Sequence, residues 1–268
     1  ETLKMTQVDG NATIQGDVKL QYQSDIYTPP PVVYLRMNEG SGTTAADSSN
    51  AGNGFDGALG GDASWTSSKY KNGPYAVEFD GASDFINLGN STTLAPNTAL
   101  SLSIWALADD FGQVYQRMVS RWQSGAGSPK YSYTLMNGNG NGKVRFYVMQ
   151  ASHVGSGTFI ETDDVVMTAG TWHHVVATYS GANTRLRLYI DGALVDTTAG
   201  GSPSSPPSSI AQGSINLSLG MNLDGSGAMH RSWDGALDEF SLWDVELTAD
   251  QVSYIYGGGS PPDLSVGI

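Results

Sequence analysis

The segment 171–197 constrains the fold of this chain more strongly than any other part of the sequence. It reads TWHHVVATYSGANTRLRLYIDGALVDT, and two of its runs alternate at every second residue. This period is that of a β-strand with one face toward a core and the other toward solvent. One alternating set comprises Val175, Ala177, Tyr179, Leu186, Leu188 and Ile190, and the other contains Val176 and Thr178. Asp191-Gly192 then separates two extended runs, the strongest short-range signal for a tight hairpin. The segment therefore predicts successive antiparallel strands.

Short runs of the same kind recur along most of the chain. They are separated by clusters of Gly, Asn, Asp and Ser, and the chain holds 34 Gly and 11 Pro. Many short strands joined by turns predict an all-β fold, a two-sheet sandwich of the jelly-roll kind. Two low-complexity segments, 137–142 and 199–213, are expected to be surface loops. The runs lie at 33–37, 75–79, 85–88, 100–107, 117–121, 131–136, 143–149, 158–161, 173–179, 185–190, 194–197, 215–219 and 236–243.

One short helix is expected near the C-terminus. Thr248 is a favourable N-cap residue, and Gln251 stands three residues later, which completes a capping box. Val252 and Ile255 would face the sandwich, and the glycines at 257–259 would end the helix.

Charge and composition exclude several classes of protein. Lys and Arg total 13 against 26 Asp and Glu, a formal net charge of −13. Nucleic acid and anionic membranes both attract clustered cations, so neither is an expected partner. The chain has no cysteine, which excludes disulfides and thiolate metal sites. No apolar run approaches the roughly 18 residues that span a bilayer, so membrane insertion is not expected.

The sequence predicts three parts: an N-terminal arm or linker at 1–31, a β-sandwich at 32–257 and a tail at 258–268. The first part is polar, with few large apolar residues, and ends in three prolines at 29–31. Ile14, Val18 and Leu20 share one face of a possible strand. Two interpretations stay open, a flexible linker and an arm that pairs with a sheet edge of this or a neighbouring subunit.

Four segments together resemble laminin-G-like type 3 domains of the concanavalin A-like lectin/glucanase superfamily. They are VYLRMNEGSGTTAADSSNAGN at 33–53, EFDGASDFINLG at 78–89, the Trp-His-His and Asp-Gly segment at 171–197, and GALDEFSLWD at 235–244. The resemblance implies a two-sheet sandwich that is often secreted, often binds carbohydrate or mediates adhesion, and frequently carries one calcium ion. It does not identify a ligand, since one fold hosts many functions.

Asp238 is the leading candidate for a calcium ligand. It shares strand parity with Ala236, Phe240 and Leu242. If that face is the core face, the carboxylate needs a cation, because an unpaired buried charge costs several kcal/mol. Calcium takes six to eight oxygen ligands. In related folds the first and last strands pair, and the resemblance therefore adds three further ligands, Glu39, Asp47 and Asp80.

The alternative gives these carboxylates structural roles. Asp47 and Asp80 would then be turn residues that accept hydrogen bonds from their own backbone. Asp238 would pair with Arg36 or with a histidine. Zinc is not expected, because the adjacent His173 and His174 point to opposite faces of a strand.

The sequence does not indicate catalysis. Retaining glycosidases of this superfamily carry Glu-x-Asp-x-x-Glu on one strand, with two carboxyl groups about 5 Å apart. Here the nearest approach is Glu161-Thr162-Asp163-Asp164-Val165-Val166, in which Val166 occupies the place of the last carboxylate. We therefore expect no enzyme activity and no catalytic residue.

Aromatic residues in loops are candidates for stacking on sugars. The candidates are Trp65, Tyr70, Trp122, Tyr131 and Trp233. Trp233 is the favoured one, because His230, Arg231 and Asp234 flank it with hydrogen-bond donors and acceptors. Burial in the core is the alternative for Trp65 and Trp122.

Two functions follow as hypotheses. The first is a secreted, non-catalytic module that binds a glycan or cell-surface polysaccharide and holds a structural calcium ion. The second is a subunit of an extracellular fibre, such as a filament or phage appendage, that displays a lectin-like domain and assembles with copies of itself through Ile14, Val18 and Leu20. Both place the chain outside the cell, on a cell or virion surface.

Overall fold

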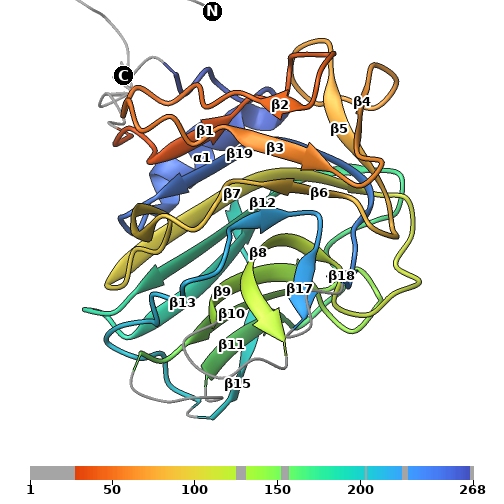
Figure 1. Cartoon of the computed structure of the whole chain (residues 1–268). Coiled ribbons are helices and arrows are strands. Elements are labelled where there is room, and N and C mark those ends of the chain that lie inside the picture. Colours follow the sequence, from red (N-terminus) through yellow and green to blue (C-terminus); the bar gives the residue numbers. More distant parts are fainter. Residues whose placement is uncertain (1–27, 125–130, 152–156, 203, 225–228, 266–268) are drawn as a thin grey trace, which may run out of the picture.

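The computed structural model describes residues 28–124, 131–151, 157–202, 204–224 and 229–265. The predicted assembly residues Ile14, Val18 and Leu20 lie outside these ranges. The described chain forms two β-sheets packed face to face (Figure 1). The predicted all-β sandwich with one short C-terminal helix is confirmed.

The first sheet has eight strands in the order β14-β13-β12-β7-β19-β5-β4, with β1 pairing β19. Its long central strands pair antiparallel, and β19 near the C-terminus lies between β7 and the early strands β1 and β5. The strands are β1 (Val33–Leu35), β4 (Ser64–Thr66), β5 (Ala76–Asp80), β7 (Ala99–Ala108), β12 (Trp172–Ser180), β13 (Arg185–Ile190), β14 (Ala193–Leu194) and β19 (Asp234–Trp243).

The second sheet has eleven strands, nine of them in the order β15-β11-β10-β9-β8-β16-β6-β3-β2. Strand β17 joins β8 and β18 at the side of this path. The strands are β2 (Thr44–Ala45), β3 (Gly57–Gly60), β6 (Phe85–Asn87), β8 (Arg117–Ser124), β9 (Tyr131–Asn137), β10 (Val144–Met149), β11 (Gly157–Thr162), β15 (Thr197–Gly201), β16 (Ser218–Leu219), β17 (Asn222–Asp224) and β18 (Met229–His230).

The predicted hairpin is present between β13 and β14. Asp191 and Gly192 have φ angles of 51° and 80°. Positive φ at both central residues is the backbone of the tight turn that matches strand twist. The Asp191 carboxylate also accepts hydrogen bonds from the main-chain N–H of His174 and from the ring of His173, both at 2.9 Å. These bonds tie the turn to the neighbouring strand β12.

The helix α1 (Ala249–Tyr256) begins and ends as predicted. Thr248 and Gln251 form the reciprocal capping box, and Gly257 closes the helix in the left-handed conformation. Two short 3₁₀ helices, η1 (Thr92–Leu94) and η2 (Gly257–Gly259), complete the described elements.

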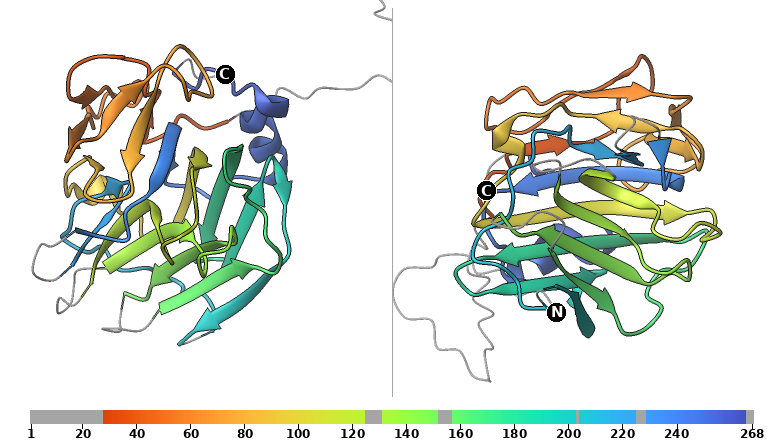
Figure 2. Two further views of the ribbon diagram at one scale, coloured as in Figure 1. Left: turned by 90° about the vertical axis from the view of Figure 1, so that its right-hand side faces the viewer. Right: turned by 60° about the horizontal axis from the view of Figure 1, so that its bottom comes forward.

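Helix α1 covers the outer face of the first sheet (Figure 2). Val252 and Ile255 of the helix pack on Val176, Tyr189 and Trp243 of the sheet. Val176 was expected to face solvent on strand parity alone, and it is fully buried because the helix covers it. The outer face of the second sheet carries no helix within the described ranges.

One predicted loop contains a strand. Residues 199–201 belong to β15, which pairs antiparallel with β11 at the edge of the second sheet. The strand reads Thr-Thr-Ala-Gly-Gly and has no alternation of apolar and polar residues. Its pairing therefore rests on backbone hydrogen bonds, which leave no signal in the side-chain pattern.

Candidate functional site

The second sheet presents two different faces. Its inner face carries a row of core residues, one from each neighbouring strand: Ile86, Leu219, Val119, Leu135, Phe146 and Ile160. Successive side chains of a strand point to opposite faces, so the next row lies on the outer face. This outer row consists of Asn87, Ser218, Ser120, Thr134, Tyr147 and Phe159.

A cavity of about 270 Å³ opens on this outer face. Strands β8, β9 and β10 supply most of its wall, and two residues outside the central strands complete it. Thr134 and Tyr147 of the outer row are part of the lining. The full lining is Tyr115, Arg117, Trp122, Thr134, Met136, Arg145, Tyr147 and Arg231.

Aromatic rings form one side of the cavity. Trp122 meets Tyr147 edge to face, with ring centroids 4.9 Å apart and planes at 83°. Tyr147 stacks on Phe159 of the next strand at 5.7 Å. Aromatic pairs at these distances hold each other in fixed orientations. The result is a rigid apolar surface beside hydrogen-bonding groups.

Three arginines also line the cavity. The Arg145 guanidinium lies 4.1 Å from the centre of the Phe159 ring and pairs with Glu161, with Nη2 and Oε2 2.8 Å apart. Arg145 and Arg231 also lie over the ring of Tyr115, at 4.8 and 5.0 Å. Arg117 lies deeper and is only 5% exposed.

The buried position of Arg117 affects its charge. Burial, together with the nearby charges of Arg231 and Arg145, lowers the pKa of Arg117 to about 9. Its Nη1 contacts the sulfur of Met136, and its Nε has no hydrogen-bond partner among the described residues. The guanidinium therefore lacks a carboxylate partner in the part of the chain whose side chains are described.

Two residues of the lining have left-handed backbone conformations. Tyr115 has a φ of 63° and Arg231 a φ of 60°. Such conformations cost non-glycine residues about 1 kcal/mol or more, and they persist where the surroundings hold them. A hydrogen bond of 2.8 Å from the Arg117 N–H to the Arg231 carbonyl contributes to this.

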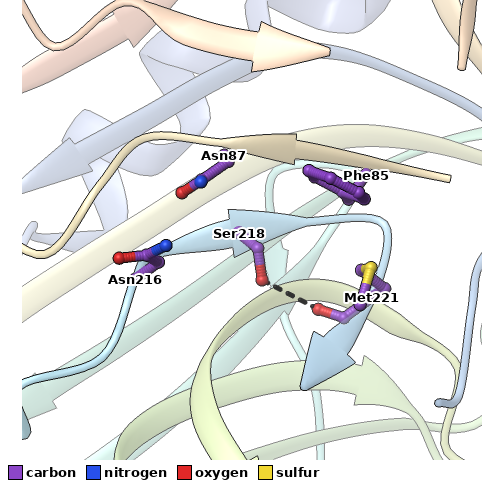
Figure 3. Close-up of a pocket in the computed structure, with 5 residues that line it drawn as sticks. All are labelled: Phe85, Asn87, Asn216, Ser218 and Met221. Atoms are coloured by element: carbon purple, nitrogen blue, oxygen red, sulfur yellow. Dashed lines mark hydrogen bonds between the residues drawn. The ribbon is translucent and has the colours of Figure 1, made fainter. Parts of the chain in front are cut away.

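A smaller hollow of about 100 Å³ lies on the same face, between β6 and β16 (Figure 3). Asn87 and Ser218 of the outer row line it together with Phe85, Asn216 and Met221. The Ser218 hydroxyl donates to the carbonyl of Met221 at 3.0 Å. Ser218 and Thr134 are two strands apart in the sheet, roughly 10 Å. The two hollows therefore lie along one line across the strands.

Comparison with known families agrees with this architecture. Residues 80–253 match the model of the Concanavalin A-like lectin/glucanases superfamily. The chain belongs to this superfamily. The family expected from the sequence, laminin-G-like type 3, is the one whose model matches.

Curated relatives match a smaller part of the chain. Over 101 residues it is 34% identical to the Sushi, von Willebrand factor type A, EGF and pentraxin domain-containing protein 1 of Mus musculus. The match covers 37% of this chain and 3% of that protein. The Rattus norvegicus protein is 33% identical over the same length, again with 3% of its own chain covered.

Solved structures share the superfamily fold at low identity. Domain 4 of the extracellular arabinanase AbnA from Geobacillus stearothermophilus, solved with arabinotriose, has a TM-score of 0.56 and 16% identity, with 83% of this chain and 96% of that chain covered. The binding domain of Paraclostridial Mosquitocidal Protein 1 has a TM-score of 0.58 and 13% identity. The match covers 85% of this chain and 52% of that chain. The Trypanosoma rangeli sialidase has a TM-score of 0.58 and 14% identity. The match covers 86% of this chain and 33% of that chain.

The structure brings together two of the predicted sugar-binding residues. Trp122 and Arg231 line the same cavity, although they are far apart in the sequence. Asp234 lies elsewhere, opposite Asp80 in the pairing of β19 with β5. His230 pairs through its backbone with Asn222, and its side chain is outside the described part of the structure.

The prediction that Trp233 stacks on a sugar is wrong. Trp233 is 0% exposed and belongs to the main core. Its indole N–H donates to the carbonyl of Leu107 at 3.2 Å, which satisfies the one polar atom of the ring. The polar residues around it gave the segment the composition of a loop, but the ring faces inward where the chain enters β19.

Sequence reasoning missed six residues of the cavity lining: Tyr115, Arg117, Thr134, Met136, Arg145 and Tyr147. For the last two a signal existed. Val144 and Phe146 alternate with Arg145 and Tyr147 in β10, and the two apolar residues are buried. The alternation therefore places an arginine and a tyrosine side by side on the outer face.

The structure corrects the reason given for Asp238. Asp238 is fully buried, but it does not share the core face with Phe240 and Leu242. A register shift between Asp238 and Ser241 reverses the parity of β19, and Leu237 joins Phe240 in the core instead. Asp238 lies opposite Trp105 on the outer face of the first sheet.

Main-chain groups donate hydrogen bonds to the Asp238 carboxylate. Its Oδ2 accepts the N–H groups of Lys71 and Asn72 at 2.9 and 3.0 Å. Arg36, the alternative partner, pairs with Asp263 at 3.0 Å instead. Burial raises the pKa of Asp238 well above its usual range, and Glu239 raises it further.

The other predicted calcium ligands also accept main-chain N–H groups. Glu39 accepts from Ala46 at 2.9 Å, and Asp80 accepts from Ala82 at 2.8 Å. Asp47 accepts from the main chain at positions 34, 49 and 55. No group of three or more His, Cys, Asp and Glu side chains that could hold a metal ion occurs in the described ranges. The four residues do not fit one calcium site, and calcium stays a prediction.

Proposed function

We propose that this chain is a non-catalytic module that binds carbohydrate on the outer face of the second sheet. The cavity beside Trp122 and Tyr147 is the observation that carries the proposal. Sugar rings present an apolar face to aromatic side chains and hydroxyls to polar groups. Here the rings of Trp122 and Tyr147 adjoin the hydroxyl of Thr134 and the arginines.

The two sheet faces differ in a way that supports this position. Helix α1 covers the part of the first sheet's outer face around Val176, Tyr189 and Trp243. The second sheet carries its two hollows along one line. An oligosaccharide repeats at intervals comparable to the strand spacing, about 5 Å. A chain of a few sugars could therefore reach from the main cavity to the smaller hollow.

Relatives with this fold provide further support. The AbnA domain was solved with arabinotriose, and several similar structures are receptor-binding or binding domains of toxins. We extend only the general role of binding to this chain. An extracellular location is part of the proposal, and no helix of the described residues is long and apolar enough to cross a membrane.

The absence of catalysis is also part of the proposal. Glu161 is engaged in an ion pair with Arg145. Asp163 accepts a hydrogen bond of 2.6 Å from the Thr198 hydroxyl. Val166 packs against the core where a third carboxylate would stand. Release of reducing ends from polysaccharides, abolished by Glu161→Gln, would contradict a purely binding role.

Glycan-array binding with matched variants tests the proposal. We expect Trp122→Ala and Tyr147→Ala each to weaken glycan binding by about tenfold or more, since each removes a stacking surface. The control is Tyr70→Ala, which removes an exposed aromatic side chain that does not line the cavity. Melting curves of all three variants verify folding. Folded cavity variants that bind like the wild type would contradict the site.

The fibre hypothesis keeps the status of a prediction. It depends on the arm, whose residues Ile14, Val18 and Leu20 are outside the described ranges.

A further inference from the structure

The main cavity concentrates positive charge in an acidic protein. The chain has a net charge of −13 and 13 Lys and Arg residues in total. Three of these, Arg117, Arg145 and Arg231, line one cavity of about 270 Å³. Like charges repel, and the repulsion grows where water is excluded. Such a cluster is unfavourable unless anions neutralise it.

Only part of this charge is neutralised within the protein. Glu161 is the one carboxylate that pairs with any of the three arginines among the side chains that the structure describes. It pairs with Arg145. Arg117 and Arg231 are left with aromatic, sulfur and main-chain contacts. Within the described ranges, Arg117 and Arg231 therefore have no acidic partner.

Arg117 has the least favourable position of the three. Only 5% of it is exposed, and its Nε has no hydrogen-bond partner among the described residues. A thioether sulfur accepts hydrogen bonds weakly and carries no charge. An anionic oxygen in the cavity would satisfy this donor and offset the desolvation of the guanidinium.

We infer that the ligand of this cavity is an acidic glycan, whose carboxylate or sulfate group binds between Arg117, Arg145 and Arg231. The inference rests on the proposed function and adds the class of sugar. The aromatic side of the cavity argues for a sugar ring and against a free inorganic anion. Trp122 and Tyr147 offer an apolar surface that sulfate or phosphate cannot use. Planar guanidinium groups suit both carboxylate and sulfate oxygens.

The test uses the full chain on an array of paired glycans. Each pair shares one backbone, with and without its acidic group: uronic acid against its methyl ester, sialylated against desialylated, and sulfated against unsulfated. We expect at least one acidic member to bind about tenfold or more tightly than its neutral partner. We also expect this preference to fall as the salt concentration is raised. Inorganic sulfate is titrated alone as a separate arm.

Variants connect the preference to the arginines. Arg231→Asn suits the left-handed backbone at this position and removes the charge. It should reduce the ratio of acidic to neutral binding by about tenfold, and Arg231→Lys should retain part of the preference. The control, Arg187→Asn, removes the same charge from β13 in the first sheet and should change nothing.

The outcomes separate the two proposals. Equal binding of acidic and neutral partners would overturn the inference and leave the carbohydrate module intact. Binding of no glycan on the array would overturn both. Inorganic sulfate that binds as tightly as the acidic glycan would identify a simple anion site and would also overturn the inference.

Discussion

Two neighbouring carboxylates, Asp238 and Glu239, are both buried on β19. Adjacent residues of a regular strand face opposite sides, and the register shift here leaves both outside the main core cluster. Glu239 accepts hydrogen bonds from the Tyr34 hydroxyl and from Asn72 Nδ2. Burial raises the pKa of Glu239 from 4.5 to about 7. The folded protein therefore holds a proton at this residue at a pH where the unfolded chain has released it.

This proton makes stability depend on pH. The pKa of Glu239 is higher in the folded state, so its contribution is complete below about pH 4.5 and is lost as the pH rises through about 7. The raised pKa of Asp238 acts in the same direction. His174 acts in the opposite direction, because burial lowers its pKa to about 3 and its contribution is lost as the pH falls below about 6.5. Stability should therefore be greatest between about pH 4.5 and 6.5.

Glu239→Gln tests the residue that carries most of this effect. Between about pH 5.5 and 8 the wild type should lose up to about 2 kcal/mol more unfolding free energy than the variant, which cannot release a proton there. Urea unfolding of both proteins at the two pH values measures the difference. An equal loss in the two proteins would show that Glu239 does not hold the proton.

At the scale of elements, helix α1 decides which sheet face is open. It covers the outer face of the first sheet through Val252 and Ile255, and Leu247 just before it belongs to the same buried cluster. The helix is short, eight residues, so its ends matter more than its propensity. The capping box of Thr248 and Gln251 fixes the first end, and Gly257 fixes the second.

Loss of the cap should destabilise the domain without affecting the ligand. Thr248→Ala removes the acceptor of the Gln251 N–H and should lower the unfolding free energy by about 1 kcal/mol. Thr248→Ser retains the hydroxyl and should be close to wild type. Chemical denaturation measures the stability, and glycan binding should be unchanged in both variants. Weaker glycan binding in the folded alanine variant would contradict the separation of the two faces.

At the scale of the whole molecule, the N-terminal arm separates the two functional hypotheses. Deleting residues 1–27 leaves Pro29, whose carbonyl accepts a hydrogen bond of 2.8 Å from the Trp243 indole. If Ile14, Val18 and Leu20 pair with a neighbouring subunit, the full chain should assemble and the truncated chain should be a folded monomer. Light scattering at matched high concentrations tests this. A monomeric full chain, or a truncated chain that still assembles, would make the arm a linker.

Calcium is also tested on the whole molecule. The sequence prediction of one bound ion requires that excess chelator lower the melting temperature by several degrees, since a ligand that binds only the folded state stabilises it. The measurement compares melting curves in calcium and in chelator, with Asp238→Asn as a variant that should abolish the difference. Identical melting curves in calcium and in chelator would contradict the prediction of a bound calcium ion.

Local patterns in the sequence determined most of the fold. Alternation predicted the long strands, the Asp191-Gly192 pair predicted the hairpin, and Thr248 with Gln251 predicted the start of the helix. These signals depend on residues close together in the chain, where side-chain period and backbone preference act directly.

Tertiary structure decided which residues meet. Trp122 and Arg231 are more than a hundred residues apart in the sequence, and they share a cavity because sheet order places their segments together. Trp233 is buried by packing that its polar neighbours do not reveal, and a register shift in β19 turns Asp238 away from the core face. Cross-strand neighbours, burial and bulges depend on the whole sheet, so no local pattern contains them.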